Sequence, residues 1–164
     1  MANPQIMTGL GAALSIFLSA SGAASGSAAS GTFALQSSST GFASFIPIVI
    51  SGVLAIYGAI VGVILSYRMF DEKLDSSDGY RHLCSGLAVG LACLASGYGI
   101  ATFVSQNTWM VPQKRSGQEE ALLSSKALPS PVMDAKFTIK MGLVLVFLEA
   151  IGLYGLIVGL ILVG

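Results

Sequence analysis

One acidic side chain in this 164-residue sequence stands apart from all the other charges. The remaining charged residues lie between Arg68 and Arg81 or between Lys114 and Lys140, whereas Glu149 lies near the middle of a long apolar segment. An ionised carboxylate there is costly, because hydrocarbon does not solvate the charge. Glu149 is therefore expected to be protonated unless a cation or a water-filled path reaches it, and we interpret it as a proton-binding residue.

Two other roles for Glu149 remain open at this stage. The side chain could make a purely structural hydrogen bond between helices, or it could help to bind a sodium ion. Sodium prefers several oxygen ligands, and residues 52–55, just before Tyr57, offer no side-chain oxygen, which favours a proton. The phenol of Tyr57 can donate a hydrogen bond to the carboxylate and so orient it. We therefore predict Tyr57 as the supporting hydrogen-bond donor.

The composition predicts a membrane protein. Hydrophobic residues make up 54% of the chain and charged residues only 10%, against roughly 25% charged in soluble domains. The net charge is zero, so nothing suggests a nucleic-acid partner. A helix needs about 20 mainly apolar residues to cross a bilayer. Four windows meet this requirement and predict an all-α membrane protein with four transmembrane helices, at Ile6–Ala29, Phe45–Tyr67, Leu83–Ser105 and Ile139–Val163.

The loops between these windows predict the orientation in the membrane. An even number of spans puts both ends of the chain on one side. The loop 68–81 carries three basic residues and the long loop at about 106–138 carries four, so the positive-inside rule predicts a cytosolic long loop and luminal termini. Ser116 and Glu119 also resemble a capping box, which predicts a short helix from Ser116 to Lys126.

Small residues line one face of several predicted helices, which is typical of membrane helices that pack closely. In the first span they recur every four positions, at Gly11, Ser15, Ser19, Ala23, Ser27 and Gly31. The third span carries Gly86, Gly90, Cys93, Gly97 and Ala101. The second and fourth spans each contain a Gly-x-x-x-Gly pair, Gly58 with Gly62 and Gly155 with Gly159.

Cysteine and histidine usage predicts no cofactor and no metal site. Cys84 and Cys93 are nine positions apart on one predicted helix, too far apart to form a disulfide. The sequence contains one histidine and no Cys-x-x-Cys motif, so it offers no obvious ligand set for a metal.

The chain contains an internal repeat. Residues 56–65 (IYGAIVGVIL) match residues 153–162 (LYGLIVGLIL) at seven of ten positions with an offset of 97, and a weaker match between the first and third spans has an offset of 75. The repeat predicts two tandem helical hairpins, 1–75 and 76–164, with 22 extra residues in the loop of the second. The first-hairpin counterpart of Glu149 is Gly52, so we expect one proton site per chain.

Residues 46–65 and 147–162 resemble the proteolipid ring subunit of V-type proton-translocating ATPases, and the Glu followed closely by Gly-Leu-Tyr-Gly carries the resemblance. The resemblance implies that copies of the chain and related proteolipids form a rotor ring in lipid, with spans one and three inside. It implies that Glu149 exchanges protons next to a stator subunit that supplies an arginine, while a cytosolic central stalk transmits rotation. It also implies a vacuolar or other acidic endomembrane location.

Three alternative functions remain at this point. They are the equivalent subunit of an F-type synthase, a small four-span secondary transporter or channel that uses Glu149, and a membrane-embedded enzyme. The duplication argues against the first, which usually has a single hairpin. The scarcity of polar residues in the spans argues against the other two. The chain has no Gly-x-x-x-x-Gly-Lys-Ser/Thr loop, so we do not expect it to hydrolyse ATP.

Overall fold

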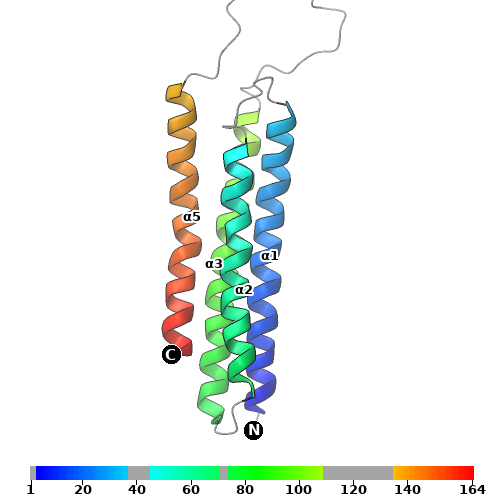
Figure 1. Ribbon diagram of the computed structural model, residues 1–164, viewed down its shortest axis with the longest axis vertical. Coiled ribbons are helices and arrows are strands. Elements are labelled where there is room, and N and C mark those ends of the chain that lie inside the picture. The colour runs from blue at the N-terminus through cyan, green and yellow to red at the C-terminus, as the bar shows by residue number, and fades with distance from the viewer. Residues whose placement is uncertain (1–2, 37–44, 71–73, 109–134) are drawn as a thin grey trace, which may run out of the picture.

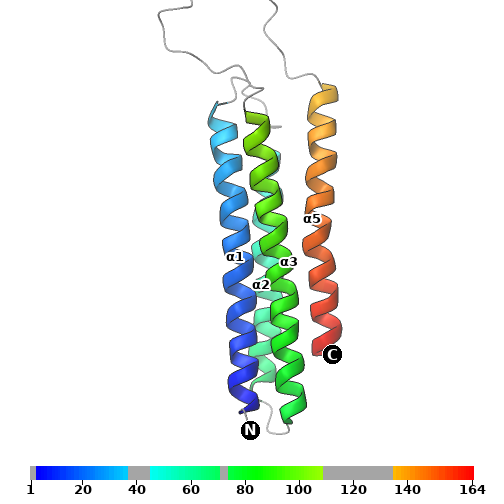
Figure 2. The ribbon, with the colours of Figure 1, turned by 180° about the vertical axis from the view of Figure 1, so that it is seen from behind.

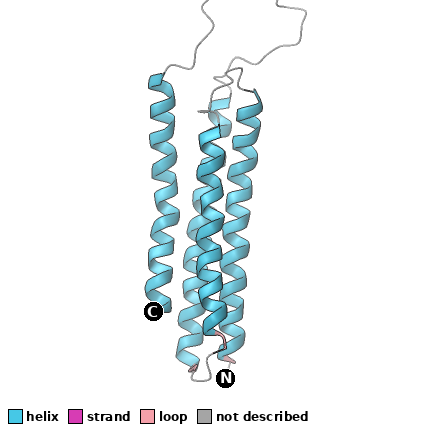
Figure 3. Ribbon diagram, viewed as in Figure 1, coloured by secondary structure: helices cyan, strands magenta, loops and turns pink. Residues whose placement is uncertain are grey.

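The computed structural model describes residues 3–36, 45–70, 74–108 and 135–164 of the chain. In this part of the chain, four helices run side by side along one long axis (Figure 1), and no strand occurs (Figure 3). They are α1 (Pro4–Gln36), α2 (Ile46–Arg68), α3 (Ser76–Thr108) and α5 (Ala135–Val163). Each is long and apolar enough to cross a membrane, which confirms the predicted all-α architecture with four spans.

Helices α1, α3 and α5 extend beyond the apolar windows read from the sequence. The first window ended at Ala29, but α1 continues to Gln36, and α3 begins at Ser76 instead of Leu83. The expected loop 68–81 was therefore too long, because residues 76–81 form the first turns of α3. Hydropathy locates only the part of a helix inside hydrocarbon, whereas backbone hydrogen bonding continues into the polar region. The predicted short helix from Ser116 lies outside the described residues.

Local sequence explains how α2 begins and ends. Pro47 lies in its first turn, where a missing backbone N–H leaves no partner unsatisfied. At the other end the backbone N–H of Met69 donates to the carbonyl of Leu65 at 3.0 Å. The chain then returns to α3, and both ends of the chain lie toward this end of the bundle (Figures 1 and 2).

The closest helix pair is α1 and α3, which run in the same direction. Glycines make the approach possible: a β-carbon at Gly11 would collide with the backbone of α3 at His82, and one at Gly97 would collide with the backbone of α1 at Gly22. A β-carbon at Gly86 of α3 would likewise collide with the backbone of Gly11 in α1. The predicted small-residue faces of the first and third spans therefore pack against each other.

The other two helices pack on this pair. Helix α2 contacts α1 and α3, and α5 contacts α3 and α2 (Figures 1 and 2). Gly58 and Gly62 of α2 lie against Ser19 and Ile16 of α1, and Gly155 and Gly159 of α5 lie against Ala92 and Val89 of α3. Each Gly-x-x-x-Gly pair thus packs an outer helix against the first helix of its own predicted hairpin.

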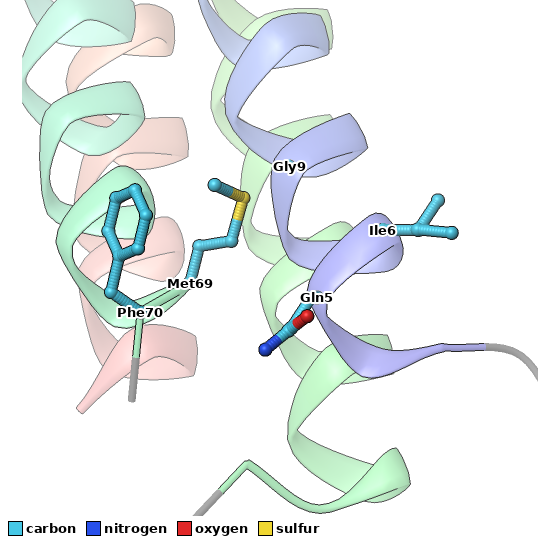
Figure 4. A pocket seen from close by; sticks show the side chains of 5 residues that line it. All are labelled: Gln5, Ile6, Gly9, Met69 and Phe70. Carbon is cyan, nitrogen blue, oxygen red and sulfur yellow. The ribbon is translucent and has the colours of Figure 1, made fainter. Parts of the chain in front are cut away.

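Polar contacts at one end of the bundle join α1 to α3. Thr8 and His82 are both buried, and the Thr8 Oγ1 lies 3.0 Å from the His82 Nδ1. On the neighbouring side, a hollow of about 300 Å³ opens between the start of α1 and the end of α2. It is lined by Gln5, Ile6, Gly9, Met69 and Phe70, and the Met69 thioether points across it toward Gly9 (Figure 4).

A candidate proton-binding site

Glu149 lies halfway along α5, at the fifteenth of its 29 residues. Its side chain is half-buried, whereas the nearby Phe147 is 69% exposed. Helix α5 has a bulky apolar surface on this outward side, as expected of a helix that contacts lipid. The carboxyl group is therefore held far from both ends of the helix, at the boundary between the bundle and its apolar surroundings.

Tyr57 of α2 reaches this carboxyl group. Its Oη donates a hydrogen bond to the Glu149 Oε1 at 3.1 Å, across 92 positions of sequence. Tyr57 is only 9% exposed, so the phenol lies within the bundle and approaches the acid from the inner side. The structure thus contains the hydrogen bond that the sequence suggested, and it orients one carboxyl oxygen toward α2.

An apolar wall closes the inner side of the pair. Gly152 lies one turn after Glu149, and a β-carbon there would collide with Leu54 and touch the Tyr57 ring and the Cys93 sulfur. Cys93 is fully buried and is not in a disulfide, as predicted from its spacing to Cys84. A glycine at position 152 lets α5 approach α2 closely enough for the hydrogen bond to form.

No basic side chain neutralises Glu149 among the residues that the structure describes. The ion pair found there joins Arg81 and Asp78 at 3.6 Å, near the start of α3. The described ranges also contain no cluster of three or more His, Cys, Asp or Glu that could hold a metal ion. Within one chain, the partner of the carboxyl group is therefore a neutral phenol, which can support either the protonated or the ionised form.

Two buried serines bond to the backbone next to this pair. The Ser15 hydroxyl of α1 donates to the carbonyl of Gly58, which follows Tyr57, at 3.1 Å. The Ser96 hydroxyl of α3 donates to the carbonyl of Leu148, which precedes Glu149, at 2.6 Å. Ser15 lies on the small-residue face predicted from the sequence, whereas Ser96 was not among the predicted site residues. Ser96 lies beside Gly97 of the small-residue face of α3, and this neighbourhood could have indicated its position in the sequence.

Several other predicted packing residues lie between helices. Ala23 is buried, Gly90 lies against Leu18, and the Ser27 hydroxyl is 2.9 Å from the Ser51 hydroxyl of α2. Gly31, by contrast, has no neighbour within 4 Å of an added β-carbon. The small-residue face of α1 therefore makes no close contact at Gly31, although the neighbouring Ser30 and Phe33 are buried.

Comparison of the two repeats reveals an uncovered face on α5. Leu54, Tyr57 and Val61 of α2 are between 0% and 9% exposed. Their counterparts at an offset of 97 are much more exposed, at 44% for Ile151, 66% for Tyr154 and 49% for Val158. On α2, Gly52 is the counterpart of Glu149, and an added β-carbon there would have no neighbour within 4 Å. The second hairpin therefore covers one face of α2, but within one chain nothing covers the equivalent face of α5.

Comparison with known proteins identifies the family. The family model for the C subunit of ATP synthase matches residues 116–162. Subunit c' of the V-type proton ATPase of Candida glabrata is 34% identical over 160 residues, which cover 93% of this chain and 84% of that protein. The chain belongs to the V-type proton ATPase proteolipid family. The human 16 kDa proteolipid of the V-type proton ATPase is 31% identical over 157 residues, 93% of this chain and 88% of that protein.

Membership in the proteolipid family confirms several interpretations of the sequence. The chain is an integral membrane protein and a ring component of a proton-translocating ATPase that assembles with other proteolipids. It is not one of the ATP-hydrolysing subunits of such an enzyme.

Proposed function

We propose that Glu149 carries the translocated proton, taking it up and releasing it as the ring turns past a stator subunit. The observation that carries this proposal is the position of the Tyr57–Glu149 hydrogen bond, halfway along α5 and without a basic partner among the described residues. Protonated Glu149 can face lipid at low cost, whereas the carboxylate needs water or a positive charge. A stator arginine next to a water-filled path would provide that environment.

The same physics couples rotation to proton transfer. A proteolipid whose carboxylate is ionised cannot move into lipid, so the ring advances only after Glu149 binds a proton. ATP hydrolysis in the cytosolic part would turn the ring through a central stalk. We further propose that the chain consists of two units, the hairpins 1–75 and 76–164. The long basic loop would face the cytosol, and the termini would face the lumen. The compartment would be a vacuole or another acidic endomembrane compartment.

We also propose that the second hairpin of one copy contacts the first hairpin of the next copy. The uncovered face of α5, formed by Ile151, Tyr154 and Val158, supports this arrangement, because the equivalent face of α2 is covered by a hairpin. A ring of copies repeats the same contact around the circle. In each such contact Tyr154 faces position 52 of the next copy, where glycine provides no carboxyl group.

The deciding experiment is Glu149→Gln, with ATP-driven acidification measured in vesicles that contain the assembled enzyme. Glutamine keeps the shape of the side chain but cannot exchange a proton, so we expect acidification to be lost while the ring still assembles. Asp78→Asn is the matched control, because it also removes a carboxylate but at the partly exposed start of α3. Full acidification by Glu149→Gln, or an equal loss in the control, would contradict the proposal.

A further inference from the structure

Buried hydroxyl groups in the described helices bond in two different ways. Several donate to a carbonyl of their own helix three or four residues earlier, as Ser19 does to Ser15 and Ser30 to Gly26. Three serines donate instead to a carbonyl of another helix. They are Ser15, Ser85 and Ser96. All three are fully buried, so the choice of partner is fixed by the packing of the bundle.

Two of these three bonds lie next to the Tyr57–Glu149 pair. Ser96 donates to the carbonyl just before Glu149, and Ser15 donates to the carbonyl just after Tyr57. Each carbonyl belongs to a helix, so it already accepts a backbone bond, and the serine adds a second bond from a neighbouring helix. The third, Ser85, donates at 2.7 Å to Gly159, ten residues beyond Glu149 and about 15 Å along the helix.

We propose that Ser96 and Ser15 are positioning residues that set the rotation and height of α5 and α2 so that Glu149 and Tyr57 meet. The inference rests on the proposed role of Glu149. A hydrogen bond to Leu148 fixes α5 against α3 at the residue where the carboxyl group must turn toward α2. The bond to Gly58 fixes α2 against α1 in the same way for the phenol. Gly152 then permits the close approach of the two outer helices.

Glycine packing alone does not set this geometry. Gly155 and Gly159 allow α5 to approach α3, but a smooth glycine surface leaves α5 free to rotate or slide by part of a turn. A directional bond at Leu148 removes that freedom, because hydrogen bonds weaken steeply when their angle or length changes. The 3.1 Å bond between Tyr57 and Glu149 depends on a long phenol and a long carboxyl side chain meeting end to end, so a small rotation of either helix breaks it.

The test compares Ser96→Ala with Ser85→Ala in the assembled ring. Both variants remove one bond from α3 to a carbonyl of α5, so Ser85→Ala is the matched control. The first readout is the infrared C=O stretching band of protonated Glu149, recognised because Glu149→Gln removes it. We expect both Ser96→Ala and Tyr57→Phe to move the band to higher frequency, because in each variant the carbonyl oxygen of Glu149 loses its donor. Ser85→Ala leaves the band in place.

The second readout is the initial rate of ATP-driven acidification. Ser96→Ala should lower it about three- to tenfold, the range that interhelical hydrogen bonds in membranes support, and Ser85→Ala by less than about twofold. The loss in Ser96→Ala should not add to the loss in Tyr57→Phe, because both act through one contact. Ser96→Thr keeps a hydroxyl group and should restore the band. Ser15→Ala should behave like Ser96→Ala.

The results separate this inference from the proposed function. An unmoved band in Ser96→Ala, an equal shift in Ser85→Ala, or additive losses with Tyr57→Phe would overturn the positioning role. If a ring with alanine at position 96 does not assemble, Ser96→Cys has nearly the same volume and a weaker donor, and the same band is read from it. Continued acidification by Glu149→Gln would overturn the proposed function instead, whatever the band shows.

Discussion

At the scale of the residue, the main feature is an acid whose only hydrogen-bond partner found in the described structure is a phenol. Tyr57 donates to Glu149 without carrying a charge of its own, so it orients the carboxyl group without holding it permanently ionised. An arginine in the same place would bind the carboxylate tightly and prevent proton uptake. A neutral donor therefore suits a residue that has to exist in both forms during each turn.

Replacing this donor should weaken proton transfer without abolishing it. Tyr57→Phe removes one interhelical hydrogen bond, worth about 1 kcal/mol in a membrane, so we expect acidification to slow roughly fivefold. The initial rate of acidification in vesicles measures the effect. Tyr154→Phe is the control, since Tyr154 is the repeat counterpart but is 66% exposed and opposes no carboxyl group. An unchanged rate in Tyr57→Phe would show that the phenol does not assist Glu149.

At the scale of the element, the central pair of helices, α1 and α3, is held together by close backbone contacts. Gly11, Gly22, Gly86 and Gly97 bring α1 and α3 together so tightly that a methyl group on any of them would meet backbone atoms. Burial of apolar surface does not drive helices together in lipid, so close packing and hydrogen bonds must provide the stability. The site depends on this pair, because α2 and α5 are both anchored on it.

This dependence predicts unequal effects of two alanine substitutions in the same helix. Gly22→Ala puts a methyl group against the backbone of Cys93 and Leu94, which cannot move aside, and should destabilise the ring by about 1–3 kcal/mol. Gly31→Ala meets open space and should be neutral or slightly stabilising. Thermal dissociation of the ring in detergent measures both. Equal midpoints for the two variants would contradict the packing argument.

At the scale of the whole molecule, one chain presents the two halves of a contact but does not close it. The face of α5 at Ile151, Tyr154 and Val158 is open, whereas the matching face of α2 is packed. In the proposed ring, a second copy, shifted by one repeat, would cover the open face with its first hairpin and leave a new open face for the next copy. This arrangement closes into a circle when the rotation between hairpins divides a full turn.

Cysteine cross-linking can test this contact between copies. Leu54 and Gly152 meet within one chain, and their repeat counterparts are Ile151 and Ala55. With Cys84 replaced by serine, Ala55→Cys combined with Ile151→Cys should give disulfide-linked dimers and higher multiples on mild oxidation in native membranes. Ala55→Cys combined with Ile161→Cys is the control, because position 161 lies about 15 Å further along α5. Monomers alone in the first pair, or equal cross-linking in both pairs, would mean that lipid or a different proteolipid covers this face.

The sequence by itself determined the class of the protein, the number of spans, the repeat and the acid. These features follow from hydropathy and spacing, which are properties of each segment alone: an apolar stretch of sufficient length must form a helix in a bilayer, because its backbone has no other hydrogen-bond partner there. The position of Glu149 within α5 follows from the same counting. Even the hydrogen bond from Tyr57 was a natural hypothesis, since Tyr57 lies on the repeat-equivalent helix of the other hairpin.

Only the tertiary structure decided which residues meet. No local sequence pattern relates the residues that meet, because they are far apart in sequence. Examples are Thr8 with His82, Ser96 with Leu148, and Gly152 with the Tyr57 ring. Helix ends also differed from the apolar windows, because hydrogen bonding along the backbone does not stop where hydrocarbon ends. Contacts between helices depend on the rotation and height of each helix in the bundle, and these are set jointly by all the neighbours through packing, which no single segment encodes.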